Sequence, residues 1–456
     1  MGTGSFGRAT LGDKRRTARL VKVAEAVMKG SSCDGGGTLT SILADPHQAK
    51  AAYRLFDSPT VTHDAVLGGH RQWVNRQLVE PGTYLLIEDT TVAAFNSRTQ
   101  AGGLGPIGES YTLGFWLHNT LAARWDPQSD RCDVLGLQAQ YAWSREPVAR
   151  TGRNKSKKKK QTTFERQKDP DRESMRWGRS LSELPAASES TRYIYVADRE
   201  SDVYEALEKC KSAGVSFVIR ASQPRALAGE LKGTDVFEAV AGAAVLGTIA
   251  VPIAREDRIA QLEVRSLTVT LRGPARPGGK LQNLTVNLVQ ASEANPPAGC
   301  AAVSWTLLSD LPVQTLEQCR QILNIYRHRW LVEELHKAMK TGLKLQESQL
   351  SDVRRLGALA AVISVAAVFL LQMKTSARTD GDTPLDEQQK QTPMVKILKK
   401  RYPTSNELTH RWLWISVAKL GGFMARKGDG DPGWLVLWRG WQTLRFLLEG
   451  YELQMQ

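Results

Sequence analysis

Residues 326–342 read YRHRWLVEELHKAMKTG, and this stretch decides how the rest of the chain is interpreted. Upstream, Thr315 and Gln318 have the spacing of a capping box, which predicts a helix that begins near Thr315. At about 100° per residue, the polar side chains fall within an arc of about 80°. They are Tyr326, Arg329, Glu333, Lys337, Lys340 and Lys344. The apolar residues fall on the opposite face, which is expected to pack on a core.

The polar face of this helix has two interpretations. It could be a solvated stripe held by i, i+4 pairs, such as Arg329–Glu333 and Glu333–Lys337. It could also be a site that presents one carboxylate among several cations and a phenol. The second interpretation gains weight from carboxylates elsewhere in the chain.

Two short apolar runs end in carboxylates. Residues 84–87 precede Glu88 and Asp89, and residues 193–197 precede Asp198. Both runs are typical of buried strands. Carboxylates at strand ends suit hard divalent cations, which prefer oxygen ligands. If Asp89, Asp198 and Glu333 converged on Mg²⁺, they would form a two-metal site for phosphoryl transfer. Their spacing alone leaves convergence open.

The composition points to a polyanionic partner. The chain has 456 residues, with 61 Lys and Arg against 47 Asp and Glu, a net charge of +14. Such an excess favours nucleic acid first and an anionic membrane surface second. The length suggests about three domains. The hydrophobic fraction of 41% excludes a wholly disordered chain.

Several classes of protein are disfavoured. The five cysteines are scattered, which argues against zinc ribbons and disulfide frameworks and fits a reducing cytosol. Residues 1–10 lack the apolar core of a signal peptide. Residues 356–373 are nearly long enough to span a bilayer, but a buried core helix is expected because basic residues flank both ends. The glycine-rich segments 35–37 and 102–108 lack the Lys-Ser/Thr that follows a phosphate-binding loop, so no nucleotide cofactor is expected.

Three other segments are notable: two are rich in basic residues, and one has the alternating pattern of β-strands. Arg15, Arg19 and Lys22 share one face of an expected helix, which is either solvated or in contact with phosphate. Residues 150–179 hold 12 basic and 4 acidic residues. This run is interpreted as a solvated loop or a tether for nucleic acid. Residues 225–310 alternate polar and apolar residues between Gly and Pro turns, which predicts a β-rich insertion.

The combination Tyr326-x2-Arg329-x3-Glu333-x6-Lys340 is similar to the signature of the insertion-sequence-four group of DDE transposases. LLIEDTT (85–91) and VADRESD (196–202) resemble that family's two aspartate motifs. LGDKRRTARLVKVAE (11–25) resembles its end-binding region. RWLWISVAKLGGFM (411–424) with PGWLVLWRGW (432–441) resembles its dimerisation region. The resemblance covers nearly the whole chain.

This resemblance implies an α/β fold with an RNase H-like catalytic core. The core would span residues 66–374, with the β-rich insertion at about 225–310. Residues 1–65 would form a helical transposon-end-binding domain, and residues 375–456 a helical dimerisation domain. Asp89, Asp198 and Glu333 would be the catalytic, metal-binding triad. The cofactor would be Mg²⁺, with Mn²⁺ as the alternative, and two ions per active site.

The resemblance also assigns DNA contacts. Tyr326, Arg329, Lys337 and Lys340 would hold phosphates near the cleavage point. Trp305 would stack on a base flipped out of the transposon end, a role that suits an indole face; the alternative is a core tryptophan of the insertion. The remaining predicted contacts are basic residues: Arg220, Arg225, Arg15, Arg19 and Lys22.

The implied activity is cut-and-paste DNA transposition. It would comprise nicking of transposon ends, hairpin formation and resolution, and strand transfer of 3′-OH ends into double-stranded target DNA. A homodimer would bridge two ends, in the cytoplasm at the bacterial nucleoid, without a membrane. Two alternatives remain: an RNase H-like structure-specific nuclease, and a non-catalytic DNA-binding inhibitor relic. The complete triad argues against the relic, whereas the short segment before Leu11 leaves it open.

Overall fold

The computed structural model of the chain describes residues 2–29, 38–43, 45–95, 101–108, 112–146, 165, 167–169, 172–253, 256 and 258–454. Glycines 35–37 and most of the basic run, residues 150–164, lie outside the described residues, so those interpretations stay predictions. The described helices of the N-terminal part are α1 (Gly2–Phe6), α2 (Lys14–Lys29), α3 (Leu39–Leu43), α4 (Pro46–Asp57) and α5 (His63–Leu78).

Ten strands of the described part form one mixed sheet, in the order β2-β3-β1-β5-β6-β12-β11-β8-β7, with β4 pairing β3. In the first half, β3 is antiparallel to both β1 and β4, whereas β5 runs parallel to β1 and β6 parallel to β5. The strands of this half are β1 (Gly82–Phe95), β2 (Gly105–Pro106), β3 (Leu113–Trp125), β4 (Cys132–Trp143), β5 (Thr191–Ala197) and β6 (Ser216–Arg220).

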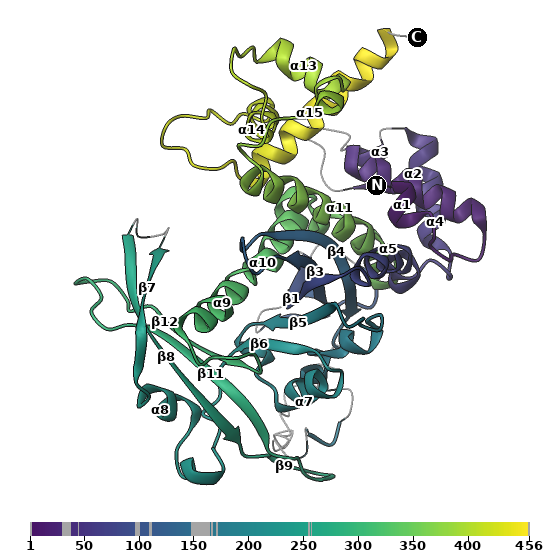
Figure 1. Cartoon of the computed structure of the whole chain (residues 1–456). Helices are drawn as coiled ribbons and strands as arrows, with labels where there is room; N and C mark the ends of the chain where they lie inside the picture. Colours follow the sequence, from purple (N-terminus) through teal and green to yellow (C-terminus); the bar gives the residue numbers. More distant parts are fainter. Residues whose placement is uncertain are drawn as a thin grey trace.

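The β-rich insertion extends this sheet. Its strand β12 pairs antiparallel with β6, with Leu307 opposite Arg220, so the edge of β6 gains a partner. Antiparallel strands then continue outward to β7 (Figure 1). These strands are β7 (Val245–Ile253), β8 (Arg258–Leu271), β11 (Leu284–Glu293) and β12 (Ser304–Ser309). A small separate ribbon pairs β9 (Ala275–Arg276) with β10 (Gly279–Lys280).

Both faces of the central strands are buried, which explains their nearly continuous apolar runs. Leu85 and Ile87 of β1 pack on one face, together with the helices α9 (Leu316–Arg327), α10 (Trp330–Lys337) and α11 (Val353–Thr379). Tyr84 and Leu86 point to the other face, which is covered by α7 (Tyr204–Ser212) and α8 (Val236–Ala241). Figure 1 shows the two sets of helices on opposite sides of the sheet. Alternate residues of β1 therefore face different environments.

The long apolar helix α11 contains residues 356–373. Among the described residues, it is the one helix that is long and apolar enough to cross a membrane. In its most apolar 18-residue stretch, 89% is buried inside the protein. It packs against α2, α5, β4 and α10. The expectation of a buried core helix at residues 356–373 is therefore confirmed.

The C-terminal helices form a small core of their own. They are α12 (Glu387–Lys390), α13 (Pro393–Arg401), α14 (His410–Leu420) and α15 (Trp434–Gln454). Trp441 of α15 donates a hydrogen bond to the carbonyl of Met28 on α2 (2.9 Å) and packs against Phe369 of α11, so the C-terminal and N-terminal helices are in contact beside α11 (Figure 1). The predicted boundary after residue 374 falls inside α11, and the domain limits stay predictions.

The helix expected from Thr315 onward is not one continuous helix in the structure. The capping box of Thr315 and Gln318 is present, but α9 ends at Arg327 and a separate α10 begins at Trp330. A π-helical turn then spans Ala338–Gly342. Lys344 has φ of 50°, a left-handed conformation that ends the helix, and pairs with Glu347. The helical projection was therefore wrong to place Lys344 on the polar arc.

Candidate active site

Asp89 lies on β1, and Asp198 directly follows the adjacent parallel strand β5. The pairing of β1 with β5 ends at Glu88 and Ala197, so each aspartate is the first residue beyond the last pair. Neighbouring strands lie about 4.8 Å apart, which brings the two carboxylates to one place. The expectation that a strand ends at Asp89 was wrong, because β3 continues to pair with β1 up to Phe95.

Helix α10 brings Glu333 toward the same place. The Nη2 atom of Arg329 donates to Oε1 of Glu333 at 2.6 Å, and its Nη1 atom lies 3.8 Å from Oδ2 of Asp89. The helix is tied to the sheet by His336, whose Nε2 accepts a hydrogen bond from the amide of Asn119 (3.0 Å). Asn119 is the residue of β3 opposite Asp89. The helix carrying Glu333 is thus fixed at the level of Asp89.

The charges at this place are only partly compensated. Burial raises the pKa of Asp89 to about 7, with the negative charges of Asp198 and Glu333 acting in the same direction. The backbone N–H of Thr90 and the guanidinium of Arg329 oppose this rise. An ordinary aspartate has a pKa near 3.8, so ionisation of Asp89 is unfavourable unless more positive charge arrives.

The donor atoms fit a hard divalent cation, although they are not arranged as a finished coordination sphere. Among the described residues, no three Asp, Glu, His or Cys side chains stand ready to hold a metal ion. Arg329 pairs with Glu333 and lies near Asp89, so these carboxylates have a guanidinium as their partner. Oxygen ligands together with an unfavourably buried carboxylate match the preference of Mg²⁺ or Mn²⁺.

Three more predicted residues lie on this face of the sheet. Alternation along β6 and β12 puts Arg220 and Trp305 on the same side as Val218 and Leu307, the side that α9 and α10 cover. Burial raises the pKa of Tyr326, and the neighbouring Arg329 and Arg220 act against this rise. Trp305 is half-buried against the core. The structure thus brings Tyr326 and Arg220 near Asp198, and it places Trp305 on the same face of the sheet.

The two lysines of α10 and its π-helical turn differ in their surroundings. Lys340 is half-buried, and burial lowers its pKa while the charge of Asp89 opposes this shift. Lys337 pairs with Glu334 at 3.6 Å rather than with Glu333, and it lies over the ring of Trp330. Its side chain is 51% exposed. The predicted Glu333–Lys337 pair is therefore wrong, and Lys340 is the lysine next to Asp89.

The remaining predicted contacts do not join this site. Arg225 donates from Nε to Oδ1 of buried Asp202 at 2.7 Å, so its guanidinium is engaged within the protein. Arg15, Arg19 and Lys22 lie on α2, as expected. Arg15 is exposed beside Asp13, and Arg19 hydrogen-bonds Gln48 of α4.

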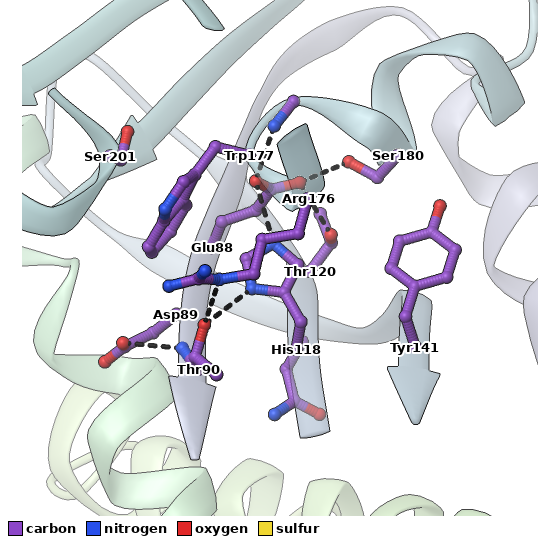
Figure 2. Close-up of polar contacts among 12 residues, drawn as sticks. Glu88, Asp89, Thr90, His118, Thr120, Tyr141, Arg176, Trp177, Ser180 and Ser201 are labelled. Atoms are coloured by element: carbon purple, nitrogen blue, oxygen red, sulfur yellow. Dashed lines mark hydrogen bonds and ion pairs between the residues drawn. The ribbon is translucent and has the colours of Figure 1, made fainter. Parts of the chain in front are cut away.

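The sequence interpretation missed the role of Glu88, the neighbour of Asp89. Its side chain is fully buried on the opposite face of β1, where Figure 2 shows it surrounded by donors. Its carboxylate accepts hydrogen bonds from His118 Nε2, Thr120 Oγ1, Ser180 Oγ, Tyr195 OH and the Gly178 N–H. Burial raises the pKa of Glu88, but His118 and these donors outweigh it and hold the pKa at about 2.

A signal for Glu88 existed in the sequence. A charged residue within a strand buried on both faces must either carry out chemistry or find several donors. Two adjacent acidic residues on such a strand point to opposite faces, so only one of them can belong to the site of Asp198. His118 is one of the donors to Glu88.

Comparison with known families now adds to this geometry. The family model described as Transposase DNA-binding matches residues 3–61, and the model described as Transposase DDE domain matches residues 172–369. The second match contains Asp198 and Glu333, whereas Asp89 precedes it. A DDE domain implies an RNase H-like core, which the mixed sheet around β1 and β5 accommodates.

The fold and the two matches support a class of protein, a DNA-binding enzyme of the DDE type. The chain carries a transposase DNA-binding domain and a transposase DDE domain, which together support a DNA transposase. Domains of the DDE type act on DNA by cleavage and strand transfer, and they generally use divalent metal ions.

Proposed function

We propose that the chain is a cut-and-paste transposase of the insertion-sequence-four group, with Asp89, Asp198 and Glu333 as its catalytic triad. The observation that carries this proposal is the meeting of Asp89 and Asp198 at the end of the β1–β5 pairing, with Arg329 and Glu333 above them. The reaction would comprise nicking of the transposon ends, hairpin formation, hairpin opening and strand transfer of the 3′-OH ends.

The triad would hold two Mg²⁺ ions, or Mn²⁺ ions in their place. Divalent ions bound there supply charge that activates the attacking oxygen and stabilises the leaving oxygen. The protein's own contribution is to hold the carboxylates in place from two strands and a helix, and to keep cations beside the phosphate. Arg329 would exchange its contact with Glu333 for a DNA phosphate, a contact that suits a guanidinium.

The surrounding residues would grip the DNA strand. Lys340, which interacts with Asp89, and Tyr326, which interacts with Asp198, would bind phosphates, and Lys337 would add a weaker contact from its exposed position. Trp305 would stack on an unpaired base, because it is half-buried on the same face. Arg220 would contact the strand near Tyr326. Arg225 remains a predicted contact, although its pairing with Asp202 supports a structural role.

Helix α2 would supply the end-binding surface, since Arg15, Arg19 and Lys22 fall within the matched DNA-binding region. Two chains would bridge two transposon ends, and α14 and α15 would contribute to the dimer. Exposed apolar side chains of α15, among them Phe446 and Leu447, are consistent with such a contact. The protein would act in the cytoplasm at the nucleoid.

The test uses purified protein, labelled terminal inverted repeats, a target plasmid and Mg²⁺. We expect nicked, hairpin and inserted products from the wild type, and none from Asp89→Ala, Asp198→Ala or Glu333→Ala. Arg192→Ala, an exposed substitution at the far end of β5, is the control and should leave all products intact. Full cleavage by the three triad variants would show that the assignment is wrong.

The same assay separates the two alternatives. A structure-specific nuclease on this scaffold would cut branched DNA without terminal repeats and would give no insertions. A non-catalytic relic would bind labelled ends and give no product from any variant.

A further inference from the structure

The β1–β5 ladder brings Asp89 and Asp198 together, but it does not fix how their carboxylates face each other, because the pairing stops one residue earlier. Each carboxylate is instead oriented by a nearby backbone amide. The N–H of Thr90 donates to Oδ1 of Asp89 at 2.7 Å. The N–H of Glu200 donates to Oδ1 of Asp198 at 2.8 Å. The relative position of Thr90 and Glu200 therefore controls how the two carboxylates face each other.

One side chain, Arg176, joins these two residues. Its Nε donates to Oγ1 of Thr90 at 3.0 Å, and its Nη2 pairs with Oε2 of Glu200 at 3.1 Å. Figure 2 shows the Arg176 side chain reaching Thr90 beside Asp89. The guanidinium is itself held by the carbonyl of Glu173, at 2.8 Å from Nη1, and it lies over the ring of Trp177. Arg176 is thus a fixed bridge between β1 and the turn after β5.

The anchor on β1 is rigid. The Thr90 hydroxyl also hydrogen-bonds Nδ1 of His118 at 2.9 Å, and the Nε2 atom of His118 bonds the buried Glu88. The anchor at the other end is looser, because the side chain of Glu200 is 66% exposed. An ion pair to so exposed a carboxylate contributes little stability. What the bridge supplies is geometry.

We propose that Arg176 is a positioning residue that sets the spacing of Asp89 and Asp198 for a divalent cation, by bridging Thr90 and Glu200. This inference rests on the proposed function, since it assumes that both aspartates bind the ion. Groups that orient metal ligands tune metal affinity without touching the metal. Arginine suits the task because its planar fork reaches two partners at once, whereas lysine reaches them as a single point.

The experiment measures Mn²⁺ binding to the full chain without DNA, by calorimetry and by electron paramagnetic resonance. We expect Arg176→Ala to weaken Mn²⁺ binding by about tenfold or more. Arg176→Lys should recover only part of this loss. The matched control is Arg179→Ala, because Arg179 lies in the same segment but covers the ring of Tyr141. It should bind Mn²⁺ like the wild type, and all variants should bind metal-free end DNA equally.

A second variant guards against misfolding. Glu200→Ala removes the exposed end of the bridge and leaves the buried network intact, and we expect up to about fivefold weaker binding. Wild-type affinity in both Arg176→Ala and Glu200→Ala would overturn the inference while leaving the proposed metal site standing. If the wild type bound no Mn²⁺ in a manner that Asp198→Asn abolishes, the proposed metal site itself would be wrong and this inference with it.

Discussion

Glu88 and Asp89 are adjacent residues of β1, but their carboxylates differ in the number of hydrogen-bond donors and in pKa. Glu88 is fully buried and accepts five hydrogen bonds, and its pKa is about 2. The side chain of Asp89 is 18% exposed, one backbone N–H donates to it, and its pKa is about 7. Both are largely withdrawn from water, so burial alone does not separate them. The number of donors does, and the carboxylate short of donors is the one that calls for a cation.

The largest expected effect comes from removing the charge of Asp89. Asp89→Asn should reduce cleavage of end DNA by roughly a thousandfold or more, as expected for one member of a catalytic unit. The free energy of unfolding should stay the same or rise, because the amide has no charge to bury. Gel assays and urea unfolding measure the two quantities. Wild-type cleavage by Asp89→Asn would contradict the catalytic role that distinguishes Asp89 from Glu88.

Glu88→Gln should have the converse effect on stability. The amide replaces an acceptor-only carboxylate that faces five donors, so we expect a loss of about 2–4 kcal/mol in the free energy of unfolding. Urea unfolding of Glu88→Gln and Asp89→Asn should give changes that differ clearly. If both substitutions changed stability equally, the two carboxylates would not be distinguished by their donors.

The two carboxylates should also give opposite pH slopes. The folded state keeps a proton on Asp89 that the unfolded state releases near pH 3.8, so Asp89 lowers stability as pH rises from about 4 to about 7. Ionised Glu88 contributes stability above about pH 4.5 that is lost as pH falls toward 2. Asp89→Asn should remove the decline between pH 4 and 7, on the order of a few kcal/mol. A decline that persisted in this variant would assign it to another group.

The smallest expected effect compares the two lysines near the site. Lys340→Ala removes a half-buried cation beside Asp89 and should slow cleavage roughly tenfold. Lys337→Ala removes an exposed cation paired with Glu334 and should slow cleavage about threefold or less. Single-turnover cleavage of labelled ends measures both variants. If Lys337→Ala slowed cleavage more than Lys340→Ala, the exposure of each lysine would not predict how much its phosphate contact contributes to cleavage.

Much of the site could be predicted from the sequence, because its parts are local. The capping box at Thr315, the buried helix at residues 356–373 and the strands before Asp89 and Asp198 depend on short-range pattern. Neighbouring parallel strands then bring both aspartates together. The family matches support the DNA-binding and DDE regions that the motifs indicated.

The rest depends on long-range contacts that a pattern does not contain. The strand at Asp89 continues because β3 pairs with it, and the insertion joins the sheet because β12 pairs with β6. The break between α9 and α10 lies where Asp130, in the β3–β4 turn, hydrogen-bonds His328 at 3.0 Å. The donors to Glu88 come from three separate segments: β3, residues 178–180 and β5. Such partners become visible only once the chain is folded.

The central claim is that Asp89, Asp198 and Glu333 share a divalent cation. Its most direct test is a crystal of the protein grown with Mn²⁺ and end DNA, with diffraction recorded at the manganese absorption edge. We predict an anomalous peak within coordination distance of Asp89 and Asp198, with Glu333 turned toward it. A peak at other carboxylates only, or a peak that persists unchanged in Asp198→Asn crystals, would contradict the claim.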